Sequence, residues 1–202
     1  MSPWLADRPL VLASQSAVRH ALLRGAGVAV EVEAADIDER AIERQADTRD
    51  PAAVAALLAL EKARRVAARR PGRLVLGADQ TLALGERRFS KPADRAAARE
   101  QLKALRSRSH ELHTAIALVR DDAVLFAHRE VARLTMRAFS DEFLESYLDA
   151  VGAAAGTSVG GYQLEREGIQ LFERIEGDHF VILGLPLMAL LQHLRQGGWL
   201  AT

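Results

Sequence analysis

The chain has 202 residues, 49% of them hydrophobic, and its 27 lysines and arginines balance 27 aspartates and glutamates. This length and composition suffice to bury a substantial core, so we expect a single domain over residues 1–202. The zero net charge argues against a nucleic-acid-binding surface, and the absence of cysteine excludes disulfides, cysteine-based zinc sites and thiol catalysis.

Short apolar runs alternate with segments of helical periodicity along the chain. In chain order we expect a strand at 9–14, a helix at 16–25, a strand at 28–34, a helix at 51–70, a strand at 73–78, a helix at 93–106, strands at 112–120 and 123–136, a helix at 140–151, a strand at 170–176 and a helix at 186–197. Small residues at 152–161 predict a flexible loop. The pattern is typical of a mixed α/β fold.

The apolar segments do not fit a membrane protein. The N-terminal segment carries Asp7 and Arg8, unlike a signal peptide, and residues 180–191 are apolar but short and broken by Gly184 and Pro186. Together with the lack of cysteine, these features predict a cytoplasmic protein with no membrane partner and no nucleic-acid partner.

The first predicted strand leads through Ser14-Gln15-Ser16 into a helix. The first turn of such a helix offers free N–H groups and hydroxyls that bind phosphate, and Arg19 adds a positive charge one turn later. The alternative is an ordinary helix for which Ser16 is the N-cap.

Asp79 follows a short apolar run and Gly77, which lets the backbone approach closely whatever lies opposite. We expect the strand to end just before Asp79, at the edge where α/β proteins place their chemistry. Asp79 is therefore a candidate general base or metal ligand, and the alternative is an aspartate that caps a turn.

Only three lysines occur among the 27 cationic residues, so each is worth considering as a phosphate ligand. Lys62 lies on the predicted helix 51–70, Lys91 precedes a proline, and Lys103 reads as a surface residue. Carboxylates at Asp36, Asp38 and Glu39 are candidates to hold Mg²⁺ jointly with substrate phosphates, unless they form a solvated turn before a helix.

The motifs together identify a family, because they follow its order over nearly the whole chain. The chain resembles the Maf nucleotide pyrophosphatases in the segments Leu12–Arg19, Gly77–Asp79, Lys91–Pro92, Ser109–Thr114, Gly160–Tyr162, Ile175–Gly177 and Gly184–Leu187. The resemblance implies a fold like that of the inosine-triphosphate hydrolases, with an elongated mixed central sheet flanked by helices and two lobes with the site in a cleft. It also implies that the protein forms a homodimer.

The resemblance implies hydrolysis of a nucleoside triphosphate to monophosphate and pyrophosphate with Mg²⁺ or Mn²⁺. It assigns Asp79 as proton acceptor, and whether this residue is base, metal ligand or both stays open. Matching positions that face phosphates or metal are Ser14, Arg19, Glu39, Lys62 and Lys91. These residue types suit the reaction, since phosphoryl transfer needs positioning, charge neutralisation and an oriented water.

The family's specificity positions correspond to Val18, Gln80 and Glu165. The branch acting on dTTP and UTP has Arg, Thr and Gln there, and the branch acting on 7-methyl-GTP has Trp, Gln and Glu. Glu165 can accept hydrogen bonds from the guanine N1–H and 2-amino groups, whereas Val18 cannot stack on a cationic base. We therefore expect a guanine-type nucleotide, N7-methylated or not, rather than dTTP or UTP.

Two other functions remain open. One is a nucleotide-binding regulator of septum formation that does not catalyse, and the other is a house-cleaning enzyme of the inosine-triphosphate-hydrolase type. A pure binder has no need of Asp79, so the retained set of metal and base residues favours an enzyme. His110 is expected to be structural or to contact phosphate, with Thr114 as its polar neighbour, and Tyr162 either lines the base pocket or is a packed aromatic.

Overall fold

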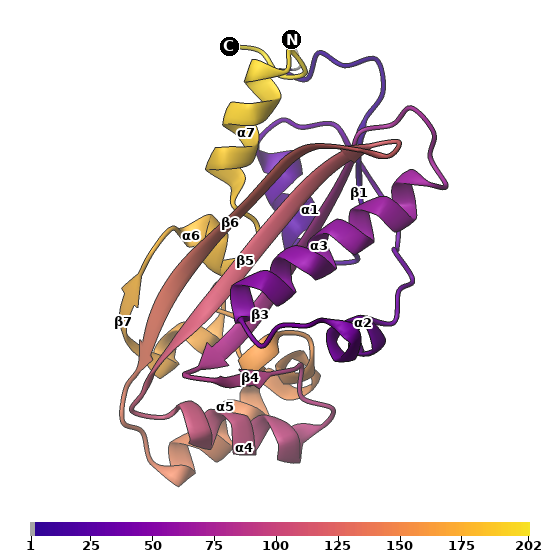
Figure 1. Ribbon diagram of the computed structural model, residues 1–202. Helices are drawn as coiled ribbons and strands as arrows, with labels where there is room; N and C mark the ends of the chain where they lie inside the picture. The colour runs from indigo at the N-terminus through magenta and orange to yellow at the C-terminus, as the bar shows by residue number, and fades with distance from the viewer. Residues whose placement is uncertain (1–2) are drawn as a thin grey trace. The chain divides into compact units, whose positions relative to one another are not determined.

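The computed structural model describes residues 3–202 (Figure 1). The described chain divides into two compact units. Unit 1 comprises the described residues up to Gln80 together with Thr114–Glu130 and Asp178–Thr202, and unit 2 comprises Thr81–His113 and Val131–Gly177. The prediction of a mixed α/β fold is confirmed, while the prediction of a single domain over the whole chain stays a prediction.

Seven strands form a mixed sheet with the order β2-β1-β3-β5-β6-β7, and β4 pairs with β3. The pairs β1–β2 and β1–β3 are parallel, whereas β3–β4 and β6–β7 are antiparallel. The strands are β1 (Leu10–Leu12), β2 (Val30–Val32), β3 (Val75–Leu84), β4 (Arg87–Phe89), β5 (Ser109–Arg120), β6 (Ala123–Met136) and β7 (Phe172–Glu176).

Unit 1 carries helices on both faces of its strands. Its helices are α1 (Ala17–Gly25), α2 (Glu39–Gln45), α3 (Pro51–Ala67), α6 (His179–Ile182) and α7 (Leu187–Gln196). Side chains alternate along a strand, so Leu10 and Leu12 of β1 pack in one core cluster with residues of α1 and α7. Val11 and Ala13 point to the opposite face and pack against α3. The sheet of unit 1 is therefore buried on both sides, as parallel strands generally are.

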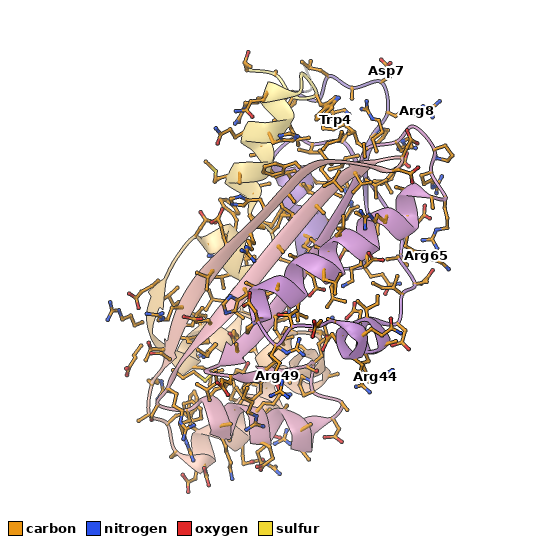
Figure 2. All side chains as sticks on the ribbon, viewed as in Figure 1. Trp4, Asp7, Arg8, Arg44, Arg49 and Arg65 are labelled. Carbon is orange, nitrogen blue, oxygen red and sulfur yellow. The ribbon has the colours of Figure 1, made fainter. Side chains whose placement is uncertain are left out.

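The helix starts in unit 1 follow the predicted capping chemistry. Ser16 caps α1 by accepting a hydrogen bond from the backbone of Arg19, and Asp50 caps α3, whose first residue is Pro51. The outward side of α3 carries exposed arginines such as Arg65, and α2 carries Arg44 (Figure 2). No helix of the described residues is both long enough and apolar enough to span a membrane.

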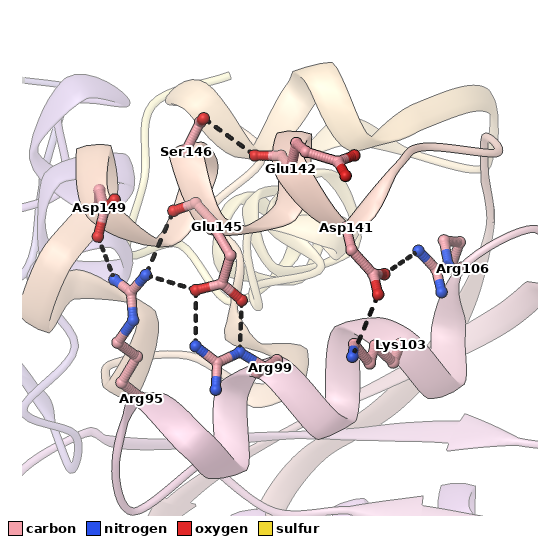
Figure 3. Close-up of polar contacts among 9 residues, drawn as sticks. All are labelled: Arg95, Arg99, Lys103, Arg106, Asp141, Glu142, Glu145, Ser146 and Asp149. Carbon is pink, nitrogen blue, oxygen red and sulfur yellow. Dashed lines mark hydrogen bonds and ion pairs between the residues drawn. The ribbon is translucent and has the colours of Figure 1, made fainter.

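Unit 2 contains α4 (Arg95–Leu105) and α5 (Asp141–Val151), which a row of ion pairs joins (Figure 3). The participants are Arg95, Arg99, Lys103 and Arg106 on one side and Asp141, Glu145 and Asp149 on the other. Glu145 accepts hydrogen bonds from both Arg99 and Arg95, and these hold the pKa of its carboxyl at about 2. Lys103, expected at the surface, lies 3.5 Å from Asp141.

Several predicted elements need correction. The strand expected at 73–78 runs on to Leu84, and the segment expected to be a flexible loop forms short 3₁₀ turns at Gly152–Gly156 and Val159–Gly161. The sequence did not predict α2, β4 or α6, each of which is seven residues or shorter. Such short elements lack the repeated periodicity that distinguishes a helix or strand from a turn.

Candidate active site

Asp79 lies inside β3 and is 8% exposed. The prediction that it follows the end of a strand is therefore wrong, because β3 continues for five more residues to Leu84. A carboxylate in the middle of a buried strand loses most of its contact with water. This position makes the charge of Asp79 costly unless neighbouring groups compensate it.

The glycine two residues before Asp79 explains why a helix comes so close to this strand. A Cβ atom on Gly77 would lie 1.9 Å from the carbonyl oxygen of Ala59 and 2.8 Å from the backbone nitrogen of Ala63, both on α3. The backbones of β3 and α3 are thus in direct contact, which confirms the close approach expected at this glycine. Residues 77 and 79 share a face of the strand, so the same contact brings Lys62 of α3 over Asp79.

The ammonium of Lys62 bridges two carboxylates. Its Nζ lies 2.6 Å from Oδ1 of Asp79 and 2.6 Å from Oε1 of Glu39, and the lysine side chain is only 12% exposed. Glu39 is the first residue of α2, and Asp38 before it caps that helix instead of joining the cluster. Asp36 pairs with Arg69 at 3.8 Å. Of the three carboxylates expected in this segment, only Glu39 shares the contact with Lys62.

Arg19 is held by oxygen atoms from three different segments of unit 1. Its Nε donates to the carbonyl of Gly184 at 2.7 Å, and one terminal nitrogen donates to Ser14 Oγ at 3.1 Å and to the carbonyl of Ala78 at 2.9 Å. The guanidinium is therefore fixed beside the residue that precedes Asp79. The structure brings Ser14, Arg19, Glu39, Lys62 and Asp79 together in unit 1, and their roles stay predictions.

Burial dominates the electrostatics of this cluster. It raises the pKa of Asp79, and Glu39 adds to the rise, while Lys62 and Arg19 oppose it. The desolvation of the carboxylate thus outweighs the attraction of two neighbouring cations, even though one of them is at hydrogen-bonding distance. A carboxylate with a raised pKa is a stronger proton acceptor than a free aspartate.

Gln80, the residue after Asp79, directs its side-chain amide inward. Its Nε2 donates to Thr114 Oγ1 at 2.8 Å and to the carbonyls of Val181 and Ile182 at 3.0 and 3.1 Å, and the Thr114 hydroxyl also donates to Val181. These contacts tie β3 and β5 to α6 and leave only the amide oxygen of Gln80 for other partners. Val18, another member of the predicted specificity set, is half-buried on α1.

The remaining predicted site residues belong to unit 2. Lys91 is exposed between β4 and α4, and Glu165 is exposed in the turn before Glu167–Leu171. His110 Nε2 lies 2.7 Å from the hydroxyl of Tyr162, both side chains are buried, and burial lowers the pKa of His110 to about 4. His110 therefore has a structural partner, and Tyr162 is a packed aromatic whose hydroxyl is buried.

Two carboxylates of the cluster are available to hold a metal ion. Among the described residues, no group of three or more histidine, cysteine, aspartate or glutamate side chains is arranged to bind a metal by itself. Asp79 and Glu39 nevertheless already share one cation, the Lys62 ammonium. Mg²⁺ is commonly bound through one or two carboxylates plus substrate phosphates and water, so this donor set fits an ion that arrives with a phosphorylated substrate.

The chain is similar to known proteins over nearly its whole length. Residues 9–197 match the family model of the Maf-like proteins. A nucleoside triphosphate pyrophosphatase of Rhodopseudomonas palustris (strain BisB18) is 57% identical over 201 residues, which cover 100% of both chains. The protein of the same name from Nitrobacter winogradskyi is 54% identical, with 100% of both chains covered. The one from Paramagnetospirillum magneticum is 53% identical, with 93% of this chain and 98% of the relative covered.

Among solved structures, a HAM1 protein from Coxiella burnetii superimposes with a TM-score of 0.40 at 22% identity, over 63% of this chain and 72% of that one. This similarity is too weak to carry an argument. The match over 189 of the 202 positions, from residue 9 to residue 197, and the identity to the three relatives are sufficient. The chain belongs to the Maf-like protein family.

Proposed function

We propose that the protein hydrolyses nucleoside triphosphates between the α and β phosphates, releasing a monophosphate and pyrophosphate. The observation that supports this most strongly is the buried Asp79 carboxylate in contact with Lys62, which also binds Glu39. A desolvated carboxylate, two cations and a pair of hard oxygen ligands suit the attack of water on a phosphoanhydride. The three relatives described above share a name that denotes the same reaction.

In this mechanism Asp79 orients the attacking water and accepts its proton. Arg19 contributes a positive charge that three oxygen partners hold in place, and Lys62 contributes a mobile one. A divalent cation bound by Asp79 and Glu39 would neutralise charge that develops on the phosphates. We propose Mg²⁺ or Mn²⁺, because both favour carboxylate oxygens.

Product analysis tests the reaction. The purified protein is incubated with GTP and Mg²⁺, with and without a chelator, and the products are separated by ion-exchange chromatography. We expect GMP and pyrophosphate, formed only when the divalent cation is present. Diphosphate and orthophosphate would mean cleavage at the γ position and would refute the proposed reaction. The same assay separates catalysis from a purely regulatory nucleotide-binding function, which would give no product at all.

For the substrate, we propose a guanine-type nucleotide in preference to dTTP and UTP. Gln80 in unit 1 keeps only its amide oxygen available, and Glu165 in unit 2 exposes a carboxylate, so both side chains present hydrogen-bond acceptors. Guanine presents two neighbouring donors, N1–H and the 2-amino group, where thymine and uracil present one. A mismatch of one hydrogen bond costs about 1–3 kcal/mol, or roughly tenfold or more in kcat/KM.

A substrate panel tests this preference. The values of kcat/KM are measured for the wild type and for Glu165→Gln with GTP, 7-methyl-GTP, inosine triphosphate, dTTP and UTP. The control is Glu173→Gln on β7, which removes another exposed carboxylate of unit 2. We expect the guanine nucleotides to exceed dTTP and UTP at least tenfold, and Glu165→Gln to reduce that ratio. Equal values across the panel would refute the specificity while leaving the reaction intact, and a maximum at inosine triphosphate would indicate a deaminated purine as substrate.

A further inference from the structure

Lys62 occupies the position between Asp79 and Glu39 that a metal ion bound by both would need. The two carboxylates, called here the carboxylate pair, are bridged by one ammonium at 2.6 Å on each side. The lysine side chain is 12% exposed, and the next residue, Ala63, is fully buried on α3. The helix therefore fixes the base of the side chain, while its four-carbon stem remains the only part able to move.

We propose that Lys62 is an internal counter-cation that competes with the divalent metal for the carboxylate pair. In the nucleotide-free protein the ammonium stabilises two carboxylates that would otherwise repel each other. The metal must displace it to bind, and the freed ammonium then becomes available to the substrate phosphates. This last step rests on the proposed function, whereas the competition itself concerns only the protein and the metal ion.

The contact geometry supports this competition. The ammonium bonds the Oδ1 atom of Asp79, and a metal ion on the pair would have to approach the same carboxylates at about 2.0–2.1 Å. Two cations that share these oxygens repel each other, and the burial of Asp79 limits the screening of that repulsion. Lysine suits such a displacement, since its charge sits on a flexible stem and its three donors can be redirected. Arg19, fixed by three oxygen atoms, does not have this freedom.

The consequence is that the metal binds weakly until phosphates offer the ammonium another partner. Metal and nucleotide then strengthen each other's binding, because the coupling between two ligands is reciprocal. A protein built this way would not hold the metal ion permanently. It would assemble its charged site only when the nucleotide is present.

The test is the affinity of the nucleotide-free protein for Mn²⁺, measured by the electron paramagnetic resonance signal of the free ion. Lys62→Met removes the ammonium but keeps an unbranched stem, and we expect it to bind Mn²⁺ at least tenfold more tightly than the wild type. Lys62→Arg keeps the positive charge and should bind as weakly as the wild type. Arg70→Met, which removes a cation paired with Glu33 elsewhere in unit 1, is the matched control and should change nothing.

Unchanged or weaker Mn²⁺ binding by Lys62→Met would overturn the proposal. If this variant does not fold, Lys62→Gln gives the same comparison, since it is neutral but still donates hydrogen bonds to the carboxylates. Adding Asp79→Asn to either variant must abolish the gained affinity, and retention of that affinity would show that the ion binds elsewhere. Because none of these measurements uses a nucleotide, their outcome is independent of whether the protein releases pyrophosphate.

Discussion

A single methyl group at Gly77 should disturb both the stability and the activity of the protein. The Cβ of Gly77→Ala would lie 1.9 Å from the Ala59 carbonyl oxygen, whereas real Cβ contacts essentially never fall under 3.0 Å. Strand β3 and helix α3 must therefore separate by about 1 Å. Overpacking against another backbone belongs at the upper end of the usual cost of about 1–3 kcal/mol.

For a chain of this size, about 3 kcal/mol corresponds to a decrease in melting temperature of roughly 6–12 °C. The same separation pulls Lys62 on α3 away from Asp79 on β3, a contact of 2.6 Å in the structure. Misplacement by about 1 Å costs on the order of 100-fold in rate. We therefore expect the folded Gly77→Ala protein to release pyrophosphate about 100 times more slowly than the wild type.

Thermal unfolding and pyrophosphate release are measured side by side for Gly77→Ala and for the control Gly25→Ala. The control adds the same methyl group at the end of α1, where nothing lies within 4 Å of the new atom. Its stability should stay within about 1 kcal/mol of the wild type, because alanine is the better helix former. Wild-type stability and turnover in Gly77→Ala would refute the close packing of β3 on α3.

Three further predictions follow from other contacts. Glu145→Gln should lower the free energy of unfolding measured in urea, and the decrease should be smaller in about 1 M salt. The difference from the wild type should vanish as pH falls through the depressed pKa of Glu145, about 2. Since burial lowers the pKa of His110 to about 4, protonation of this residue opposes folding, and the free energy of unfolding should fall as pH drops from about 6.5 toward 4. His110→Gln should remove this pH dependence from urea unfolding. Gln80→Ala removes the side-chain donor of the Ile182 carbonyl, while the Val181 carbonyl keeps the Thr114 hydroxyl, and should cost about 1–3 kcal/mol by the same method.

The sequence predicted the long elements well because their patterns repeat. The alternating run at 123–136 gave β6 with its observed bounds, and Asp50-Pro51 marked the start of α3 by capping chemistry. The end of β3 was misplaced because Gly77 and Asp79 are typical of turns, and nothing local shows that a strand continues through them. The reason for the glycine lies in α3, the preceding helix, which packs on it only in the fold.

The site was predicted from residue types and from the order of motifs, and this identified most of the cluster in unit 1. What the sequence could not supply is the pairing between residues. Lys62 was expected to face phosphate, and its bridge between two carboxylates depends on how α2 and α3 approach β3. Gln80 was expected to read the base, but three internal acceptors take up its amide group. The partners of Gln80 lie 34 or more residues away along the chain.

The turnover of Asp79→Asn tests the central claim most directly. Pyrophosphate release and melting temperature are compared for the wild type, Asp79→Asn and the control Asp141→Asn, which removes an exposed carboxylate in unit 2. Because burial raises the pKa of Asp79, ionisation of this residue opposes folding, and stability falls as pH rises from the ordinary aspartate pKa, so Asp79→Asn should melt no lower than the wild type at neutral pH. The account predicts that this intact variant loses about 10²–10⁴-fold in turnover while Asp141→Asn keeps its activity. An Asp79→Asn protein that retains more than about half of wild-type turnover would contradict the assignment of Asp79 as the base.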